Sequence, residues 1–229
     1  MSDFFNNPAF GIGVTLVVYV SAQLLYQRTR KIFLNPVAVA VIVLITLLEL
    51  GHIPYASYRV GGDMILFLLG PAVVALGVPL YEQRSEILKR KLPILAGVAA
   101  GAVASIVSAS GLAWLLGGSR EVVLSLAPKS VTTPIAIGIA EKIGGIAPLT
   151  AALVVVTGCL GGMCGPEFCR WIGVRQAVAR GLAVGTASHG IGTARMLEID
   201  HLAGATSGLA IGLNGLITAF VLPLMLLFV

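Results

Sequence analysis

The chain has 229 residues, of which 57% are hydrophobic and 11% are charged, and its mean hydropathy is +0.98. Soluble domains carry about 25% charged residues, so this composition excludes a soluble domain and indicates an integral membrane protein in a lipid bilayer. The formal charge of +5 comes from basic residues that cluster in short loops between apolar runs, which is typical of membrane topology. We therefore expect no nucleic acid as a partner.

Apolar runs close to the roughly 20 residues that cross a hydrocarbon core recur along the chain. They cover residues 10–26, 34–50, 64–81, 93–116, 147–169 and 203–228. The first run lacks the basic residues that precede the apolar part of a signal peptide, so we expect it to be a retained helix. The runs leave no room for a separate soluble domain.

Basic residues between the runs predict the orientation of the chain. Residues 27–31 follow the first run and residues 84–91 follow the third, and both segments carry clusters of positive charge. Loops rich in Lys and Arg stay in the cytoplasm. This places the N-terminus outside.

Residues 120–145 form either one broken helix that crosses the membrane or a hairpin that enters and returns. If they cross, the next run, 147–169, ends outside and places the arginines of residues 170–180 there, against the positive-inside bias. We therefore favour a hairpin, and the same reasoning predicts a second hairpin over about residues 174–200. Both termini then lie outside.

Polar segments interrupt the apolar sequence at two corresponding places. When the chain is shifted by 56 residues, Thr132 aligns with Ser188 and Thr133 aligns with His189, along with several apolar positions. The chain then contains two repeat units, and each is a hairpin followed by a spanning helix. The two hairpins enter the membrane from opposite sides. This is the inverted-repeat architecture of secondary transporters, whose sites form at broken helices.

These patterns predict an all-α polytopic membrane protein with about six transmembrane helices plus two re-entrant or discontinuous helical segments in an inverted repeat. Residues 1–229 form a single integral membrane domain in this prediction. Residues 1–118 are expected to be scaffold helices, and residues 119–229 are expected to be the substrate-binding repeat pair.

The first interruption is bracketed by two prolines. Pro128 disfavours helix at the residue before it and has no N–H to donate, which predicts the end of a half-helix. Thr133 and Pro134 are typical of an N-cap and a first helical position, which predicts a second half-helix from Ile135 to about Ile143. Its N-terminal N–H groups and positive dipole end suit a carboxylate.

The second interruption repeats this chemistry. Ser188 is a candidate cap, Gly190 and Gly192 permit close approach of the backbone, and Thr193 and Arg195 follow on the next turn. Two half-helix N-termini that converge from opposite sides predict a cavity that prefers anions. Ionisable residues inside a membrane span are costly and indicate function.

The candidate substrate-binding residues come from the two interruptions, with one mid-helix asparagine that aligns with Gly158 in the repeat. They are Lys129, Ser130, Thr132, Thr133, Pro134, Ser188, His189, Gly190, Thr193, Arg195 and Asn214. Alternative interpretations remain open. Lys129 can snorkel to an interface, and Arg195 can be an inside-loop charge. His189 can bond a backbone carbonyl, and the hydroxyls or the asparagine can pack between helices.

Signals of catalysis and metal binding are absent from the sequence. Paired carboxylates or a Ser/His/Asp arrangement do not occur at a supportable spacing. Cys159, Cys164 and Cys169 lie five residues apart, which spreads them around one helix. We expect no enzyme activity, no metal and no cofactor.

Several motifs carry a resemblance to a known family. They are residues 71–76 with 79–81, residues 128–136, and residues 185–189 with 192–195. With these motifs the chain resembles the LrgB/CidB family, and within it the YohK-like inner-membrane proteins, over nearly its whole length. The resemblance implies a bacterial inner (plasma) membrane location and a small LrgA/CidA-type membrane subunit as a partner. We also expect a homo-oligomer.

The resemblance implies two kinds of function. The family was first described as holin-like regulators of murein hydrolase export and cell lysis, whereas plastid relatives are glycolate/glycerate translocators and bacterial members are linked to pyruvate or lactate transport. We expect a transporter of a small monocarboxylate anion that works by alternating access, because broken helices suit a buried anion site. The alternative is a holin-like pore or a regulator of murein hydrolase export and cell lysis.

Overall fold

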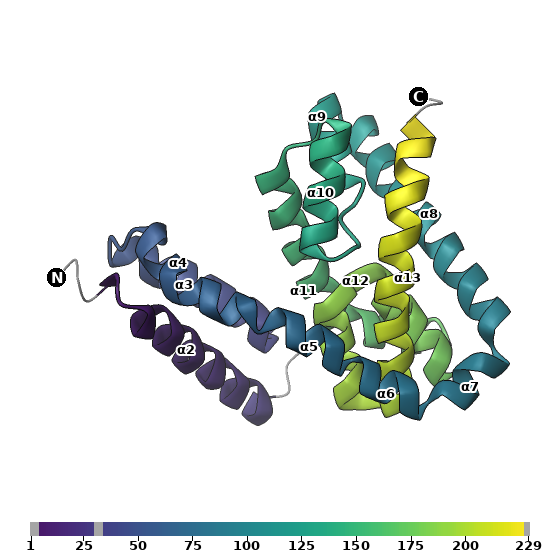
Figure 1. The fold of residues 1–229 in the computed structure, drawn as a ribbon, viewed down its shortest axis with the longest axis horizontal. Helices are drawn as coiled ribbons and strands as arrows, with labels where there is room; N and C mark the ends of the chain where they lie inside the picture. Colours follow the sequence, from purple (N-terminus) through teal and green to yellow (C-terminus); the bar gives the residue numbers. More distant parts are fainter. Residues whose placement is uncertain (1–4, 30–33, 227–229) are drawn as a thin grey trace. The chain divides into compact units, whose positions relative to one another are not determined.

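The computed structural model describes residues 5–29 and 34–226, and these residues form α-helices joined by short turns (Figure 1). The helices are α2 (Pro8–Thr29), α3 (Pro36–Leu50), α4 (Tyr55–Phe67), α5 (Leu69–Ala75), α6 (Gly77–Glu82), α7 (Arg84–Lys89), α8 (Lys91–Leu115), α9 (Arg120–Leu126), α10 (Thr133–Ile143), α11 (Ala147–Trp171), α12 (Ala177–Ile199) and α13 (His201–Leu226). The described part of the chain contains no strand.

Five helical segments in the described residues are long and apolar enough to cross a membrane, and α3 is a shorter apolar helix of 15 residues. The five are Pro8–Thr29, Tyr55–Glu82, Lys91–Leu115, Ala147–Trp171 and His201–Met225. The predicted all-α polytopic membrane protein is therefore confirmed. The end of the basic segment 27–31 and the end of the run 203–228 lie outside the described residues.

The chain divides into two compact units, residues 1–76 and residues 77–229. In the first unit α2 packs against α3 and α4. Gly11 allows the close approach to α4, because a Cβ there would lie 2.5 Å from the Tyr58 carbonyl oxygen. The hydroxyls of Thr15 and Tyr58 are 2.9 Å apart and join the same two helices. Small residues and hydroxyls of this kind hold helices together in membranes.

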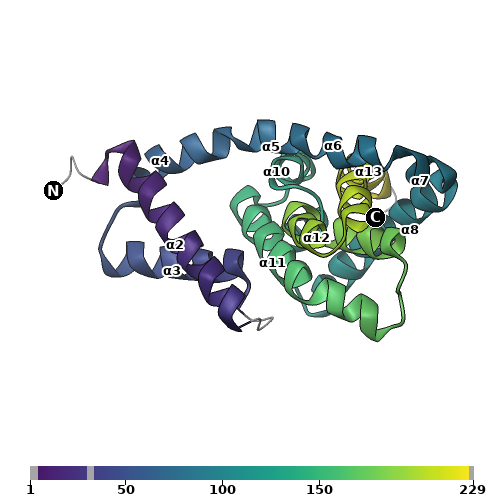
Figure 2. The same ribbon diagram turned by 90° about the horizontal axis from the view of Figure 1, so that it is seen from below.

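In the second unit α12 lies between α11 and α13 (Figure 2). Glycines on α12 allow the closest contacts. A Cβ on Gly181 would overlap the hydroxyl of Thr206, and a Cβ on Gly185 would lie 2.7 Å from Ser207 Oγ. The backbones of α12 and α13 therefore touch directly, as small residues permit in membrane bundles.

Residues 120–145 form the first hairpin, in which α10 returns along α9. Ile146 N donates a hydrogen bond to Ser125 Oγ at 2.7 Å, and Ala127 belongs to the same core cluster as Ile139. A single straight helix would separate Ala127 from Ile139 by about 18 Å, because each residue rises 1.5 Å. The segment therefore folds back, which is the geometry that the arginine distribution favoured.

Helix boundaries at the first turn differ from the prediction. Thr132, not Thr133, is the N-cap of α10, with an extended backbone (φ −65°, ψ 147°). Thr133 and Pro134 are thus the first helical residues, and α10 begins before Ile135. Proline is tolerated here because the N–H groups of a first helical turn have no partner inside the helix.

Residues 177–199 form the second hairpin, in which α12 breaks at His189 (φ 43°, ψ −136°). Val184 and Met196 nevertheless share one core cluster, and a Cβ on Gly192 would lie 2.8 Å from Val184 Cγ1. A straight helix would place Val184 and Met196 about 18 Å apart. The second half of α12 (190–199) therefore folds back along the first half (177–188).

The two hairpins enter the second unit from opposite ends. The first hairpin follows the C-terminal end of α8 directly, whereas Gln176, just before α12, lines the same cavity as Arg90 at the N-terminal end of α8. Figure 1 shows α9 and α10 at the top of this unit and α12 lower. An inverted repeat has this arrangement. The side of the membrane from which each hairpin enters stays a prediction.

Candidate functional site

A cavity of about 760 Å³ lies between α8 and the first half of α12 and reaches the turn of the first hairpin. One face of α8 lines it from Arg90 to Ser108, and the turn contributes Lys129 and Ser130. The middle of its wall is glycine, alanine and aliphatic side chains, whereas polar side chains gather at its two ends. We call the end at Lys129 the polar end.

Hydroxyl groups surround the ammonium group of Lys129 at the polar end. Lys129 Nζ is 3.1 Å from Ser130 Oγ and 3.4 Å from Ser105 Oγ, and the two hydroxyls are 2.7 Å apart. An ammonium group has three N–H donors, so one donor is left after these bonds. Within the described residues no carboxylate forms an ion pair with Lys129. In the described part of the chain this half-buried cation therefore lacks a counter-ion, and an anion would supply one.

Thr186 of the second hairpin faces the same cavity. Its side chain is only 6% exposed, and its Oγ1 has no hydrogen-bond partner among the described residues. Gly101 on α8 makes room for it, because a Cβ on Gly101 would lie 2.9 Å from Thr186 Cγ2. A buried hydroxyl without a partner is costly, so Thr186 has an unused donor and acceptor in the wall of the cavity.

Asn214 of α13 connects the two interrupted segments. Its side-chain amide donates to the carbonyl oxygen of Ser130 at 3.1 Å and to that of Thr186 at 3.0 Å. The side chain is 1% exposed and does not line the cavity. Asn214 therefore holds the turn of the first hairpin against the second hairpin. Its predicted contact with substrate stays a prediction.

The tip of the second hairpin packs on glycines of α11. His189 Nε2 lies 2.9 Å from the carbonyl oxygen of Val154, and a Cβ on Gly158 would be 2.6 Å from the imidazole ring. A Cβ on Gly161 would overlap the side chain of Ser188. His189 thus makes the backbone-carbonyl bond of the alternative interpretation. Ser188 precedes the break, and its Oγ has no hydrogen-bond partner among the described residues, so it does not cap the second half-helix.

The remaining predicted residues also lie away from the cavity. They are Thr132, Thr133, Pro134, Gly190, Thr193 and Arg195. Thr193 Oγ1 is 2.6 Å from Ser207 Oγ, and Arg195 pairs with Glu198 at 2.9 Å. The start of α10 is covered by a cluster of Val131, Ala136 and Val154. The half-helix N-termini therefore do not bound this cavity, and the part of these residues in substrate binding stays a prediction.

Three hydroxyl residues at the polar end were not among the predicted site residues: Ser105, Ser108 and Thr186. Ser105 and Ser108 continue a face of α8 that includes Gly97 and Gly101, at spacings of three or four residues. This spacing marks one helix face, but helix packing in membranes produces the same pattern. A binding face and a packing face therefore look the same in the sequence. Only the structure, in which the turn of the first hairpin packs against this face, distinguishes them.

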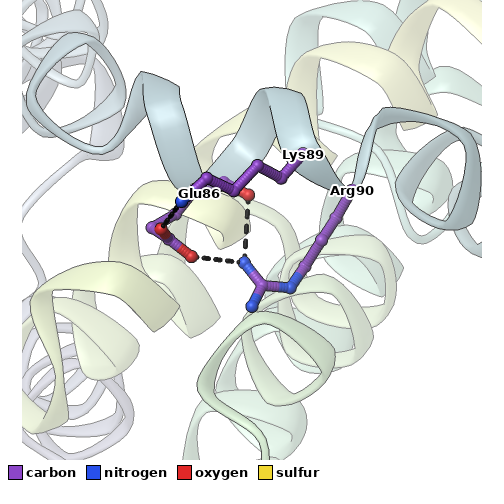
Figure 3. A network of polar contacts seen from close by, with 3 residues as sticks. All are labelled: Glu86, Lys89 and Arg90. Atoms are coloured by element: carbon purple, nitrogen blue, oxygen red, sulfur yellow. Dashed lines mark hydrogen bonds and ion pairs between the residues drawn. The ribbon is translucent and has the colours of Figure 1, made fainter.

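Arg90, which lines the other end of the cavity, belongs to a network of three charged side chains (Figure 3). Glu86 accepts from Lys89 Nζ through one oxygen and from Arg90 Nη1 through the other, both at 2.6 Å. The hydrogen bonds from Lys89 and Arg90 hold the pKa of Glu86 at about 2. Glu86 is therefore ionised throughout the physiological pH range, and Arg90 is the member that lines the cavity.

Comparisons with known proteins match nearly the whole chain. The sequence model of the LrgB-like family matches residues 15–228. The chain is 38% identical over 211 residues to the uncharacterized protein YxaC of Bacillus subtilis (strain 168), covering 92% of each chain. It is 36% identical over 215 residues to the uncharacterized protein YwbG of the same organism, covering 94% of this chain and 96% of that one.

A further relative carries a functional name. The chain is 34% identical over 223 residues to the antiholin-like protein LrgB of Bacillus mycoides (strain KBAB4), covering 97% of each chain. No solved structure gives a significant match.

Proposed function

The chain belongs to the LrgB-like family, and we propose that it binds a small monocarboxylate beside Lys129 and carries it across the membrane. The observation that carries the proposal is the half-buried ammonium group of Lys129, which meets hydroxyls at the end of a cavity in a unit with membrane-spanning helices. A cation without a counter-ion is costly in such surroundings. A bound carboxylate offsets this cost.

The polar end suits a carboxylate flanked by a hydroxyl or keto oxygen. One cation matches one carboxylate, whereas a dicarboxylate would leave a second charge without a partner at the polar end. The hydroxyls of Ser105, Ser130 and Thr186 can donate to or accept from the neighbouring oxygen of the substrate. Glycolate, glycerate, lactate and pyruvate all carry a carboxylate beside a hydroxyl or keto oxygen. The polar end therefore suits all four as substrates equally.

The hairpins support movement of the substrate by alternating access. Past the polar end, the first hairpin packs against α8 and α13 through Ile106, Ala127, Ile139 and Leu222. We infer that this apolar cluster closes the path beyond the hairpin turn and that the anion enters along α8 from the Arg90 end of the cavity. Transport then requires the hairpins to move and open the other side, as in secondary transporters with broken helices.

Location and assembly complete the proposal. Loop charge supports residues 84–91 in the cytoplasm of a bacterial inner-membrane protein, with both termini outside. A homo-oligomer and a small LrgA/CidA-type membrane subunit stay predictions.

Uptake by proteoliposomes tests the proposed transport. We expect purified full-length protein to give saturable uptake of radiolabelled glycolate that unlabelled pyruvate, lactate and glycerate inhibit, because they compete for Lys129. Succinate, a dicarboxylate, is the control competitor. It should inhibit glycolate uptake poorly, because its second charge has no partner at the polar end. Uptake equal to that of protein-free liposomes, or uptake that rises linearly with concentration, contradicts carrier-type transport.

Gly97 offers a way to obstruct the cavity without disturbing the backbone. A Cβ on Gly97 meets nothing within 4 Å, and this residue lines the cavity. We expect Gly97→Leu to fill the path along α8 and to lower glycolate uptake about tenfold or more. Gly111 lies on the same helix with equally open space but outside the cavity, so Gly111→Leu should retain at least half of the activity. Equal rates in the two variants would remove this cavity from the transport path.

The names of relatives favour a second candidate function, an antiholin-like membrane regulator. The antiholin-like protein LrgB covers 97% of this chain, and this relationship supports the second candidate more directly than it supports transport. A pore or a regulator of murein hydrolase export needs no saturable carboxylate site. Liposome leakage of solutes of increasing size, together with murein hydrolase activity in the medium of producing cells, separates the candidates. A change in hydrolase activity without saturable uptake supports the regulator.

A further inference from the structure

Arg90 lies at the opposite end of the cavity from Lys129. Arg90 is the N-cap of α8 and the first cavity-lining residue at this end of the helix. Ser105, which contacts Lys129, lies 15 residues later on the same helix. At a rise of 1.5 Å per residue, the two ends are about 22 Å apart along the helix. A small monocarboxylate cannot touch both ends at once.

We propose that Arg90 is an entrance site, the first binding point of the anion before it reaches Lys129. Glu86 is a positioning residue that holds the Arg90 guanidinium at the mouth of the cavity. This inference rests on the proposed transport of a carboxylate and adds a second anion site to it.

The hydrogen bonds of Arg90 leave one edge of its guanidinium available. Nη1 donates to Glu86 Oε2 at 2.6 Å and to the Glu86 carbonyl oxygen at 3.1 Å (Figure 3). Nε and Nη2 make no hydrogen bond within the described residues. These two nitrogens form the fork that binds a carboxylate through two parallel hydrogen bonds.

Charge around the mouth favours the arrival of an anion. Residues 82–91 carry four basic and two acidic side chains, and Glu86 divides its two oxygens between Lys89 and Arg90. Clefts lined by one sign of charge raise the local concentration of ligands of the opposite sign. Exposed ion pairs such as these contribute little to folding stability. The main effect of the Glu86 network is therefore to orient the Arg90 guanidinium.

The cavity wall between Arg90 and Lys129 lets the anion leave the first residue and reach the second. Gly97, Gly101, Ala183 and Leu182 line this stretch. These side chains offer no hydrogen bond that would hold an anion between Arg90 and Lys129. The anion is therefore held at the mouth by Arg90 and then at the polar end by Lys129.

Initial glycolate uptake at low substrate concentration tests the entrance site in full-length protein. We expect Arg90→Gln to lower this rate about tenfold in low salt, to weaken its dependence on NaCl, and to change the maximal rate less than twofold. Arg90→Lys keeps the charge but loses the fork, so it should retain the salt dependence and only part of the rate. Arg170→Gln removes the same charge from an exposed arginine that pairs with Glu167 at 3.0 Å and does not line the cavity, so this variant should stay within twofold of the unsubstituted protein.

Protection from phenylglyoxal, which modifies arginine, measures binding at Arg90 without transport. Glycolate should protect Arg90, but not Arg84, which lies over the Tyr81 ring outside the cavity. Saturable uptake without protection of Arg90, or equal losses in Arg90→Gln and Arg170→Gln, overturns the entrance site alone. Protection without saturable uptake overturns transport but supports the entrance site, and the absence of both overturns both.

Discussion

Replacing Lys129 with methionine is expected to lower glycolate uptake at low substrate concentration about 100-fold. Methionine keeps most of the side-chain volume but removes the cation that Ser105 and Ser130 surround. Loss of one partner from a buried, hydrogen-bonded charge pair costs about 2–5 kcal/mol, and each 1.4 kcal/mol is about tenfold in affinity. The measurement is the initial rate of uptake into proteoliposomes.

Controls separate loss of the anion site from loss of the fold. Lys142, on α10, is exposed and does not line the cavity, so Lys142→Met should retain at least half of the rate. Lys129→Met should melt at or above the temperature of the unsubstituted protein, because it removes a half-buried charge that has no carboxylate partner in the described residues. Normal uptake by a correctly folded Lys129→Met protein contradicts the proposed site.

Local sequence signals predicted the interruptions because their physical causes are local. Pro128 cannot continue a helix on its own hydrogen bonds, and Thr133 with Pro134 resembles a helix start. The start was misplaced by one residue because Thr132 has the extended backbone of the N-cap. The return of each hairpin was inferred from the arginines of residues 170–180. It is seen in the hydrogen bond of Ile146 N to Ser125 Oγ in the first hairpin and in the close approach of Gly192 to Val184 in the second.

The cavity depends on contacts between distant segments and could be predicted only in part. Lys129 was found because a cation inside an apolar segment is costly. Ser105 and Thr186 were missed, because a serine or threonine on an apolar helix is equally typical of helix packing. His189 meets the Val154 carbonyl across 35 residues of sequence, a distance over which no local pattern decides between a ligand and a structural bond.

Asn214→Ala is expected to destabilise the protein by about 3 kcal/mol. The substitution removes the donors to the carbonyl oxygens of Ser130 and Thr186 and leaves both oxygens buried. Each buried group without a partner costs about 1–3 kcal/mol. Because the two carbonyls belong to different hairpins, the loss also separates Ser130 from Thr186 at the polar end of the cavity. Equilibrium unfolding in mixed micelles measures the change.

Asn214→Asp distinguishes lost hydrogen bonds from lost volume. Aspartate has nearly the same size, but an ionised carboxylate only accepts hydrogen bonds, so two carbonyl oxygens would face it without a donor. We therefore expect Asn214→Asp to be at least as destabilising as Asn214→Ala. Leu216→Ala, on the same helix at a side chain that is 58% exposed, should change stability by less than about 1 kcal/mol. If Asn214→Asp is as stable as the unsubstituted protein, the amide does not hold the two hairpins together, and the coupling must lie in the glycine contacts between α12 and α13.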